Sequence, residues 1–265
     1  MTERIIPSAS HRVTNDVIYR LITERITPEA RVLEFGAGRG HMCQRLGRYF
    51  REHGKEPGAQ LVACEIVPEV FQCVEIKCHR IGTDSVIPFP AASFDLIYAI
   101  EVLEHTPRPY DFFKEAFAKL KPGGHLIFSV PNTLHFQSRI SFLLTGFPEM
   151  FGPPSSLDQN AGRICGHIMP LSYPYFVTGL RRTGFAAIHF VKDRTKRGAA
   201  FLAVLCYPLL RLASWRYARA LLSYDAGVWE ENAGVVAEVN RLPMLTSRSC
   251  IVVAQKPQTP APPAG

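Results

Sequence analysis

Short apolar runs bounded by turn residues recur along the chain and predict buried β-strands. The expected strands are Arg31–Phe35, Gln60–Cys64, one strand within Glu75–Gly82, Phe94–Ile100, His125–Val130, Ala187–Val191 and Cys250–Ala254. Between them, apolar positions spaced three or four residues apart predict helices. This alternation indicates an α/β fold with a doubly wound, mostly parallel sheet of seven strands and helices on both faces.

The helix boundaries follow from capping and breaking residues. Ser10 is expected to cap a first helix that ends before Pro28. The turn Pro122-Gly123-Gly124 is expected to lead into the strand that starts at His125. The other helices are expected near Gly40–His53, after Pro68, over Tyr110–Leu120 and over Leu171–Arg182, with Gly184 closing the last one.

Two long segments interrupt the alternation of strands and helices. Residues 1–30 are expected to form an N-terminal helical segment ahead of a single domain over 31–255. Within that domain we expect 131–170 to form a lid and 192–249 to form a basic, apolar helical insertion. The proline-rich tail 256–265 is expected to be disordered.

The run VLEFGAGRGH predicts a buried strand that ends in a glycine-rich turn. Gly36, Gly38 and Gly40 allow positive φ and let the backbone approach a ligand that a Cβ would block. The spacing differs from the dinucleotide fingerprint G-x-G-x-x-G, whose third glycine would fall at His41. No Gly-Lys-Ser/Thr follows, so the run is not a P-loop. An ordinary tight turn is the alternative.

The composition suits one sizeable α/β domain with insertions, since 47% of the 265 residues are hydrophobic. A net charge of +7 and a pI near 9.1 fit nucleic acid, anionic lipid or an anionic substrate alike. Seven cysteines without a C-x-x-C pair indicate reduced thiols, and Cys64, Cys73, Cys78 and His79 match no zinc-site spacing. No signal-peptide core and no run of ~18 apolar residues are found, so the expected localisation is cytoplasmic.

Four motifs occur in order: VLEFGAGRG, VACEIVPE, IPFPAASFDLIYAIEVLEHT and LKPGGHLIFSVPN. Together they resemble the class I S-adenosylmethionine-dependent methyltransferases, in the group related to type 11 and quinone-biosynthesis enzymes. The resemblance covers roughly 31–130 and the elements near 171–191 and 250–254. It implies a Rossmann-like fold and S-adenosyl-L-methionine as the cofactor, and it says almost nothing about the acceptor.

The same resemblance implies roles for the residues around the first motif. It places the backbone from Gly36 to Gly40, including Ala37 and Gly38, under the cofactor. It places Glu34 near the methionine ammonium group of the cofactor. These residues form the first half of the expected cofactor site.

The second half of the expected cofactor site follows the next strands. Glu65 would accept hydrogen bonds from both ribose hydroxyls, because a carboxylate offers two acceptor oxygens. Ile66 would pack on the adenine, and Ile100 is a further expected cofactor-binding residue. Many relatives have an adenine-binding Asp where this chain has Thr83 followed by Asp84, so both residues are candidates.

Methyl transfer is an in-line displacement that requires alignment, exclusion of water and, for a hydroxyl acceptor, a base. In the sequence EVLEHT, Glu101, Glu104 and His105 follow a strand and are expected at the carboxyl edge of the sheet. His105 is the first candidate for the base, because imidazole titrates near neutral pH. Glu101 and His167 complete the candidate catalytic residues. The alternative is that Glu104 and His105 only hold the loop and cap a helix.

Small-RNA 2′-O-methyltransferases carry a similar E-x-x-E-H run with a further distant His, and they bind Mg²⁺ there. His167, in CGHIMPLSY, could take that fourth position, which makes metal-dependent RNA methylation an alternative. Hydrogen bonds among two carboxylates and two imidazoles explain the same residues without a metal, and no metal is the leading expectation. Nucleic acid is disfavoured, because no RNA-binding module accompanies the basic run.

The first insertion gives one clue to the acceptor. Asn132–Gly146 reads NTLHFQSRISFLLTG and resembles the segment after the fifth strand in bacterial methyltransferases of polysaccharide and lipid-linked glycan gene sets. A long insertion at this place commonly forms a lid that positions the substrate and excludes water.

The second insertion gives another clue. A basic run, Lys192, Arg194, Lys196 and Arg197, precedes an apolar stretch in which Pro208 is expected to start or kink a helix. On that helix, one arc of roughly 140° holds Arg211, Arg216 and Arg219, while the other side holds Leu209, Ala213, Tyr217, Ala220 and Leu221. Such a helix suits an interface with anionic lipid, or it packs on its own domain or on a second subunit.

The leading hypothesis from the sequence is O-methylation of a small or carrier-linked acceptor, such as a glycan or a quinone-like lipid. The protein would then work in the cytoplasm, with contact to the inner face of the membrane and homodimer formation as further expectations. A non-catalytic, cofactor-binding partner subunit is the alternative from a different class.

Overall fold

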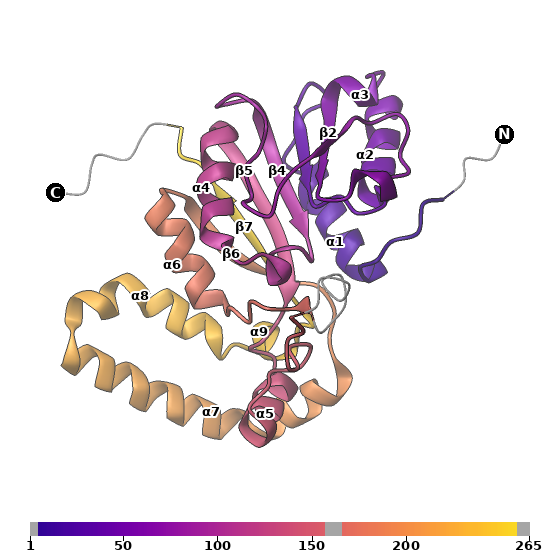
Figure 1. The fold of residues 1–265 in the computed structure, drawn as a ribbon. Helices are drawn as coiled ribbons and strands as arrows, with labels where there is room; N and C mark the ends of the chain where they lie inside the picture. The colour runs from indigo at the N-terminus through magenta and orange to yellow at the C-terminus, as the bar shows by residue number, and fades with distance from the viewer. Residues whose placement is uncertain (1–4, 157–165, 259–265) are drawn as a thin grey trace. The chain divides into compact units, whose positions relative to one another are not determined.

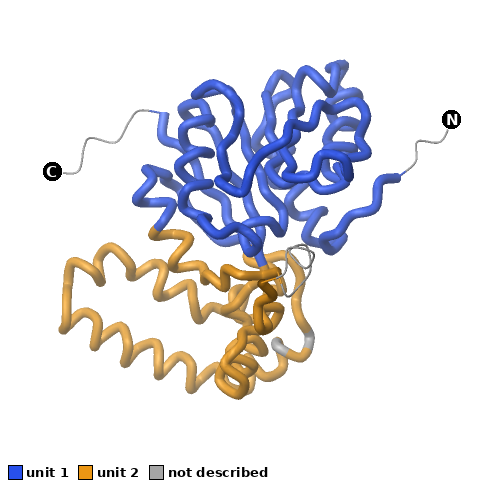
Figure 2. The backbone as a smooth tube through the Cα atoms, viewed as in Figure 1, with its two compact units in different colours: residues 1–130, 179–191, 251–265 blue, residues 131–178, 192–250 orange. Residues whose placement is uncertain are grey.

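The chain forms two compact units in the computed structural model, which describes residues 5–156 and 166–258. Unit 1 comprises residues 1–130, 179–191 and 251–265, and unit 2 comprises 131–178 and 192–250 (Figure 2). The two segments that interrupt the strand–helix alternation therefore make up nearly all of unit 2. Most of the expected disordered tail, 259–265, lies outside the described residues.

Unit 1 is built on a seven-stranded sheet of order β3-β2-β1-β4-β5-β7-β6 (Figure 1). Its strands are β1 (Val32–Phe35), β2 (Leu61–Glu65), β3 (Cys78–Arg80), β4 (Phe94–Ile100), β5 (Leu120–Pro131), β6 (Ala186–Lys192) and β7 (Ser249–Gln255). β1 pairs in parallel with β2 and β4, β2 with β3, and β4 with β5. The strand order reverses between β1 and β4, which makes the carboxyl ends of these strands a topological switch point. The doubly wound, mostly parallel fold expected from the sequence is confirmed.

Helices cover both faces of this sheet, with α2 and α4 on opposite sides (Figure 1). The helices of unit 1 are α1 (Arg12–Thr23), α2 (His41–Glu52), α3 (Pro57–Gln60), η1 (Pro68–Val70), η2 (Leu103–His105) and α4 (Pro109–Lys119), with the end of α6 (Tyr173–Thr183). Side chains alternate between faces along β1. Val32 packs in one core cluster with Leu46 and Phe50 of α2. Phe35 packs on Phe112 of α4, with the ring centroids 4.5 Å apart.

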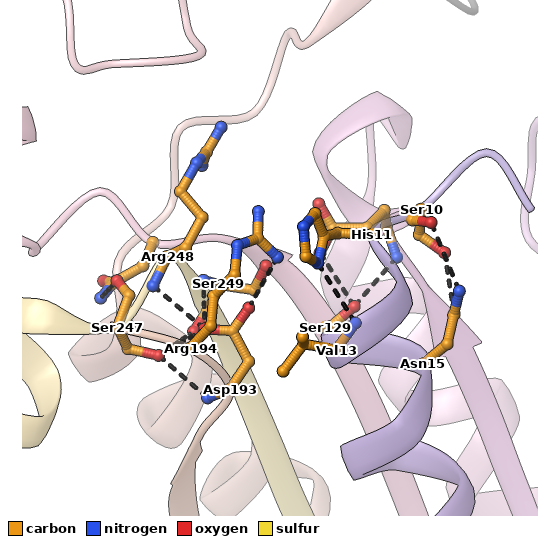
Figure 3. Close-up of polar contacts among 12 residues, drawn as sticks. Ser10, His11, Val13, Asn15, Ser129, Asp193, Arg194, Ser247, Arg248 and Ser249 are labelled. Atoms are coloured by element: carbon orange, nitrogen blue, oxygen red, sulfur yellow. Dashed lines mark hydrogen bonds and ion pairs between the residues drawn. The ribbon is translucent and has the colours of Figure 1, made fainter. Parts of the chain in front are cut away.

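The structure corrects two boundaries predicted for unit 1. The first helix is capped by His11, whose Nδ1 accepts from the backbone N–H of Val13, and not by Ser10, which donates to Asn15 (Figure 3). The fifth strand starts at Leu120 and not at His125. Phe94 pairs with Leu120 and Leu96 with His125, so residues 121–124 form an irregularity inside the strand instead of a turn before it.

Unit 2 is mainly helical. It contains α5 (Phe136–Thr145), the start of α6, α7 (Arg197–Tyr224), α8 (Ala226–Val239) and α9 (Leu242–Thr246). Phe136 of α5, Ala203 of α7 and Leu245 of α9 form its buried cluster. Pro208 lies inside the 28-residue α7, so of the two expected roles the structure excludes a helix start, and a kink stays a prediction. Every helix within the described residues is too short or too polar to cross a membrane.

Polar groups also fix the interior of unit 2. The Arg139 guanidinium donates to the carbonyl oxygen of Leu134 at 2.7 Å, to Oδ1 of Asn240 at 2.5 Å and to the carbonyl oxygen of Val239 at 2.6 Å. It therefore joins the start of α5 to the end of α8. Oδ1 of Asp193 accepts from the Ser247 hydroxyl and from the backbone N–H groups of the next two residues (Figure 3).

Candidate active site at the carboxyl edge of the sheet

Three glycines make the turn after β1, and each position requires glycine for its own physical reason. All three have positive φ: 72° at Gly36, 51° at Gly38 and 87° at Gly40. A Cβ on Gly36 would lie 2.5 Å from the side chain of Val102, and one on Gly40 would lie 2.6 Å from the Phe71 ring. A Cβ on Gly38 would have no atom of the described residues within 4 Å. The turn is thus packed at both ends and open at its centre.

The carboxylate of Glu65 holds the centre of this turn. Its Oε2 accepts from the backbone N–H of Gly38 at 2.7 Å, and its Oε1 accepts from those of Ile66 at 2.7 Å and Val67 at 3.4 Å. The carbonyl oxygen of Cys64 accepts from the N–H groups of Gly36 and Ala37. Because two carboxylate oxygens have about four acceptor positions, Glu65 keeps about one more, on Oε2, for a ligand at the open side of the turn. Next to it, the side chain of Ile66 is 46% exposed.

Glu34 lies in β1, two residues before the first glycine of the turn, and is almost fully buried. Its Oε2 accepts from the Tyr98 hydroxyl at 3.0 Å. Burial raises the pKa of Glu34 to about 7, although hydrogen bonds from Cys43 and Tyr98 act in the opposite direction. The carboxyl group of Glu34 therefore titrates near neutral pH. Its expected contact with an ammonium group stays a prediction.

The end of β4 brings two carboxyl groups to the same edge. After the half-buried Ile100, Glu101 has a φ of 53°, a left-handed conformation that is uncommon for a residue with a side chain. Ser129 of β5 holds it, since the Ser129 hydroxyl donates to Oε1 of Glu101 at 2.9 Å. Glu104 in η2 is buried, and its Oε2 has no hydrogen-bond partner within the described residues. Burial, followed by the charge of Glu101, raises the pKa of Glu104 well above its ordinary value.

The two candidate histidines belong to different units. His105 ends η2 in unit 1 and is half-buried. His167 lies in unit 2, where its ring is 5.4 Å from that of Phe151 and its Nδ1 lies 2.7 Å from the carbonyl oxygen of Met150. A carbonyl oxygen only accepts, so Nδ1 carries the proton. A joint role of His105 and His167, with or without a metal, stays a prediction.

Thr83 and Asp84 follow β3 in an exposed loop. The Asp84 carboxylate accepts from the backbone N–H of Val86 at 3.3 Å, which is a turn-forming contact. Both residues stay candidates for the adenine contact.

Sequence reasoning missed the residues that support the site. Tyr98 is the one hydroxyl-bearing residue of the apolar strand β4, and Ser129 has the same place in the apolar part of β5. A lone hydroxyl in a buried parallel strand needs a partner, so both residues could have been noticed. The packing of Val102 and Phe71 on glycines has no sequence signal, because it depends on loops that meet only in the folded chain.

The residues of unit 1 fit a nucleoside-bearing cofactor. Open backbone at Gly38, the spare acceptor position on Glu65 and the exposed residue Ile66 are adjacent, and they match a ribose hydroxyl and the face of a base. Glu34 adds a carboxyl group directly before the same turn.

Comparisons with known proteins agree with this geometry. Residues 9–189 match the family described as methyltransferase domain. A ubiquinone biosynthesis O-methyltransferase of Xanthomonas axonopodis pv. citri (strain 306) is 28% identical over 136 residues, 48% of this chain and 54% of that protein. One from Acinetobacter baylyi is 29% identical over 104 residues, covering 38% and 44%. The chain thus spans about half the length of the curated relatives it matches.

Solved structures show the same fold at low sequence identity. A phosphoethanolamine N-methyltransferase 2 of Haemonchus contortus, in complex with S-adenosyl-L-methionine, has a TM-score of 0.54 at 13% identity, over 96% of this chain and 55% of that one. A methyltransferase of Thermotoga maritima, titled a possible histamine N-methyltransferase, has a TM-score of 0.52 at 14% identity, over 93% and 90%. The chain belongs to the family of methyltransferase domains and has the fold of the S-adenosylmethionine-dependent methyltransferases.

Proposed function

We propose that the chain is an S-adenosylmethionine-dependent methyltransferase that methylates an oxygen of a small or carrier-linked acceptor, such as a quinone-like lipid or a glycan. The observation that carries the proposal is the open glycine turn with the Glu65 carboxylate bonded to its centre. The O-methyltransferases named among the relatives support oxygen as the methylated atom.

When bound, S-adenosylmethionine supplies an electrophilic methyl group. Glu65 accepts hydrogen bonds from the ribose diol, and Ile66 covers the adenine. Glu34 lies directly before the same turn with its pKa near 7, and a cation beside it would favour its ionised form. The complex would then have the carboxylate of Glu34 facing an ammonium group.

His105 is the proposed base for the acceptor. It follows β4 at the carboxyl edge of the sheet, where ligands of doubly wound folds bind. Its imidazole would take the hydroxyl proton while the acceptor oxygen bonds to the methyl carbon and the methyl–sulfur bond breaks, with the bonding electron pair left on the sulfur. Glu101, which Ser129 holds in place, and His167 complete the proposed acceptor-facing residues.

Calorimetric titration of the purified chain with S-adenosylmethionine tests the cofactor site. We expect Glu65→Gln to weaken binding at least about tenfold, because the amide replaces an ionised acceptor with a donor on one side. Glu69→Gln is the matched control: its carboxylate is exposed and pairs with Arg80, and its affinity should stay near wild type. No binding by the wild-type chain at millimolar cofactor would remove the proposal.

Label transfer tests the reaction. The chain is incubated with methyl-labelled cofactor and with phenol, quinol and glycan acceptors, and the products are analysed for a gain of about 14 mass units. We expect His105→Gln to lower turnover while cofactor affinity stays within about twofold. His53→Gln, an exposed histidine at the end of α2, is the control. If Glu101→Ala, His105→Ala and His167→Ala all left methylation in cells unchanged, the chain would be a non-catalytic partner instead.

A further inference from the structure

One face of α7 carries an exposed apolar stripe that no part of the described chain covers. We propose that this stripe, the α7 outer face, docks on the surface of an anionic lipid bilayer. It consists of Phe201, Val204, Leu205, Leu209, Leu212 and Trp215, whose exposed fractions run from 52% to 73%. The inference deepens the proposed function, because it gives a lipid-carried acceptor a place to meet the enzyme.

The six side chains share one side of the helix. At about 100° per residue they fall within an arc of about 140°. The opposite side, with Ala203 and Leu210, packs in the cluster of unit 2 with Phe136 and Leu245. α7 therefore has two apolar faces, of which the inner one supplies the packing of unit 2. The outer one adds no core contact and exposes large side chains to solvent.

The charges on α7 identify the partner. By helical spacing, Arg211 lies just outside one margin of the outer face, and Arg216 lies within the face near its other margin. Arg219 follows along the middle of the face at its C-terminal end, 4.9 Å from the Trp215 ring. The sequence from 197 to 224 holds no Asp or Glu. From 192 to 224 it holds seven Lys and Arg against one acid, Asp193, whose Oδ1 already accepts three hydrogen bonds. Apolar side chains with long arginine side chains beside and among them suit an interfacial helix on anionic headgroups, because the arginine stems can lie along the apolar surface while their charges reach the headgroups.

A second copy of the chain fits this face less well. A two-fold contact would place the same patch against itself, so that the arginines of both copies would approach one another. An anionic bilayer instead offers negative charge at the headgroups and an apolar layer directly below them. Tryptophan side chains are enriched at the boundary between the headgroups and the apolar layer, and Trp215 lies on this face.

Vesicle sedimentation with the full chain tests the apolar part of the proposal. We expect binding to phosphatidylglycerol–phosphatidylcholine vesicles and little binding to pure phosphatidylcholine. Leu205→Asp/Leu212→Asp should lower the partition coefficient at least about tenfold, because two carboxylates would enter the acyl boundary. The control Ile5→Asp/Val74→Asp makes the same change at two other exposed apolar residues, 70% and 97% exposed, and should bind within about twofold of wild type.

A second pair of variants tests the charges without touching the apolar residues. Arg211→Gln/Arg216→Gln should weaken binding by about fivefold for each charge removed, and added salt should reduce the difference. The control, Arg12→Gln/Arg182→Gln, removes the same number of positive charges at two exposed residues of unit 1. In a Trp229→Phe background, Trp215 fluorescence should shift to shorter wavelength with anionic vesicles only.

Several results would overturn the proposal. Wild-type chain that stays in the supernatant with anionic vesicles would do so, and so would equal binding by the Arg211→Gln/Arg216→Gln pair and its control. If light scattering showed a dimer that Leu205→Asp/Leu212→Asp converts to monomer, with unchanged vesicle binding, the face would belong to a second copy. Cofactor titration of the same samples separates this outcome from failure of the proposed function, because the turn at Gly38 and the α7 outer face share no residue.

Discussion

At the scale of single residues, Glu34 combines burial with a place directly before the glycine turn. Its carboxyl group faces the Tyr98 hydroxyl inside the sheet. Its pKa rises from 4.5 to about 7 on folding, so the folded chain holds a proton that the unfolded chain releases between these pH values. The neutral form therefore stabilises the fold below about pH 4.5, and this contribution is lost as the pH rises through 7.

Glu34→Gln should remove this pH dependence. Wild-type unfolding free energy should fall between pH 5 and pH 8 by up to about 3 kcal/mol more than that of the variant, which cannot ionise. Urea unfolding at both pH values measures the difference. Glu52→Gln, at the exposed end of α2, should keep the wild-type slope. Equal slopes in wild type and Glu34→Gln would contradict the assignment of the titration to Glu34.

The centre and the start of the glycine turn should respond differently to a methyl group. Gly38→Ala places a methyl group in open space, and its only cost to the fold is backbone strain at a positive φ, so we expect a loss of about 1 kcal/mol in stability. Because the same methyl group would lie where the cofactor is expected, we also expect cofactor affinity to fall at least about tenfold. Gly54→Ala, also at positive φ with open surroundings, is the control for strain and should leave affinity unchanged.

Gly36→Ala should also destabilise the fold, since its Cβ would meet Val102 at 2.5 Å. Adding Val102→Ala removes the two methyl groups that clash and should restore part of the lost melting temperature. No recovery in the double variant would mean that backbone strain at Gly36, and not the Val102 contact, sets the cost.

At the scale of elements, a single side chain joins the start of α5 to the end of α8. Arg139 makes three hydrogen bonds, to Leu134 before α5 and to Val239 and Asn240 at the end of α8. Burial lowers its pKa to about 10, which still leaves it charged at neutral pH. A guanidinium can reach three acceptors in one plane, and an ammonium cannot reproduce that geometry.

Arg139→Lys should therefore loosen the end of α8. We expect a cost of about 1–3 kcal/mol and faster hydrogen exchange over 234–240, while exchange in β1 and β2 stays as in wild type. Arg241→Lys, which keeps an exposed pair with Glu238, is the control. Unchanged exchange over 234–240 in Arg139→Lys would show that helix packing alone holds this end.

At the scale of the whole molecule, the candidate cofactor site and the α7 outer face lie in different units. Unit 1 supplies the sheet edge with the turn, Glu65 and the end of β4. Unit 2, made from two insertions far apart in sequence, supplies α5, which lies in the segment predicted to form a lid, and the exposed helix α7. A ligand bound to unit 1 should therefore slow hydrogen exchange in unit 1 and leave exchange in α7 unchanged.

Saturating S-adenosylmethionine should slow hydrogen exchange at 36–41, 65–67 and 101–106, and should leave 200–224 near its unliganded rate. At a hundredfold excess over the dissociation constant, the added stability is about 2.7 kcal/mol, visible as a rise in melting temperature. Anionic vesicles should give the converse pattern, with slower exchange over 200–216. Protection by the cofactor confined to α7 would contradict both assignments.

The sequence by itself determined the order of strands and helices, the place of the glycine turn and the acidic residue after the second strand. These follow from local periodicity and from glycine's conformational freedom, which act within a few residues. The third strand could be located only to a range, since its three residues, Cys78–Arg80, pair at the sheet edge and have a weak apolar pattern. Likewise, hydrogen bonding of His11 and Asn15 decided the first helix start.

Only the tertiary structure decided which groups meet. Glu65 and Gly38 are 27 residues apart, Glu34 and Tyr98 are 64 apart, and Arg139 and Asn240 are 101 apart. No local pattern encodes such pairs, because they form when strands and helices pack side by side. The faces of α7 show the same limit: Leu209 and Tyr217 are exposed along with the arginines, although spacing alone placed them on the opposite side. Which side of an amphipathic helix is buried depends on what packs against it, and that is a property of the folded chain.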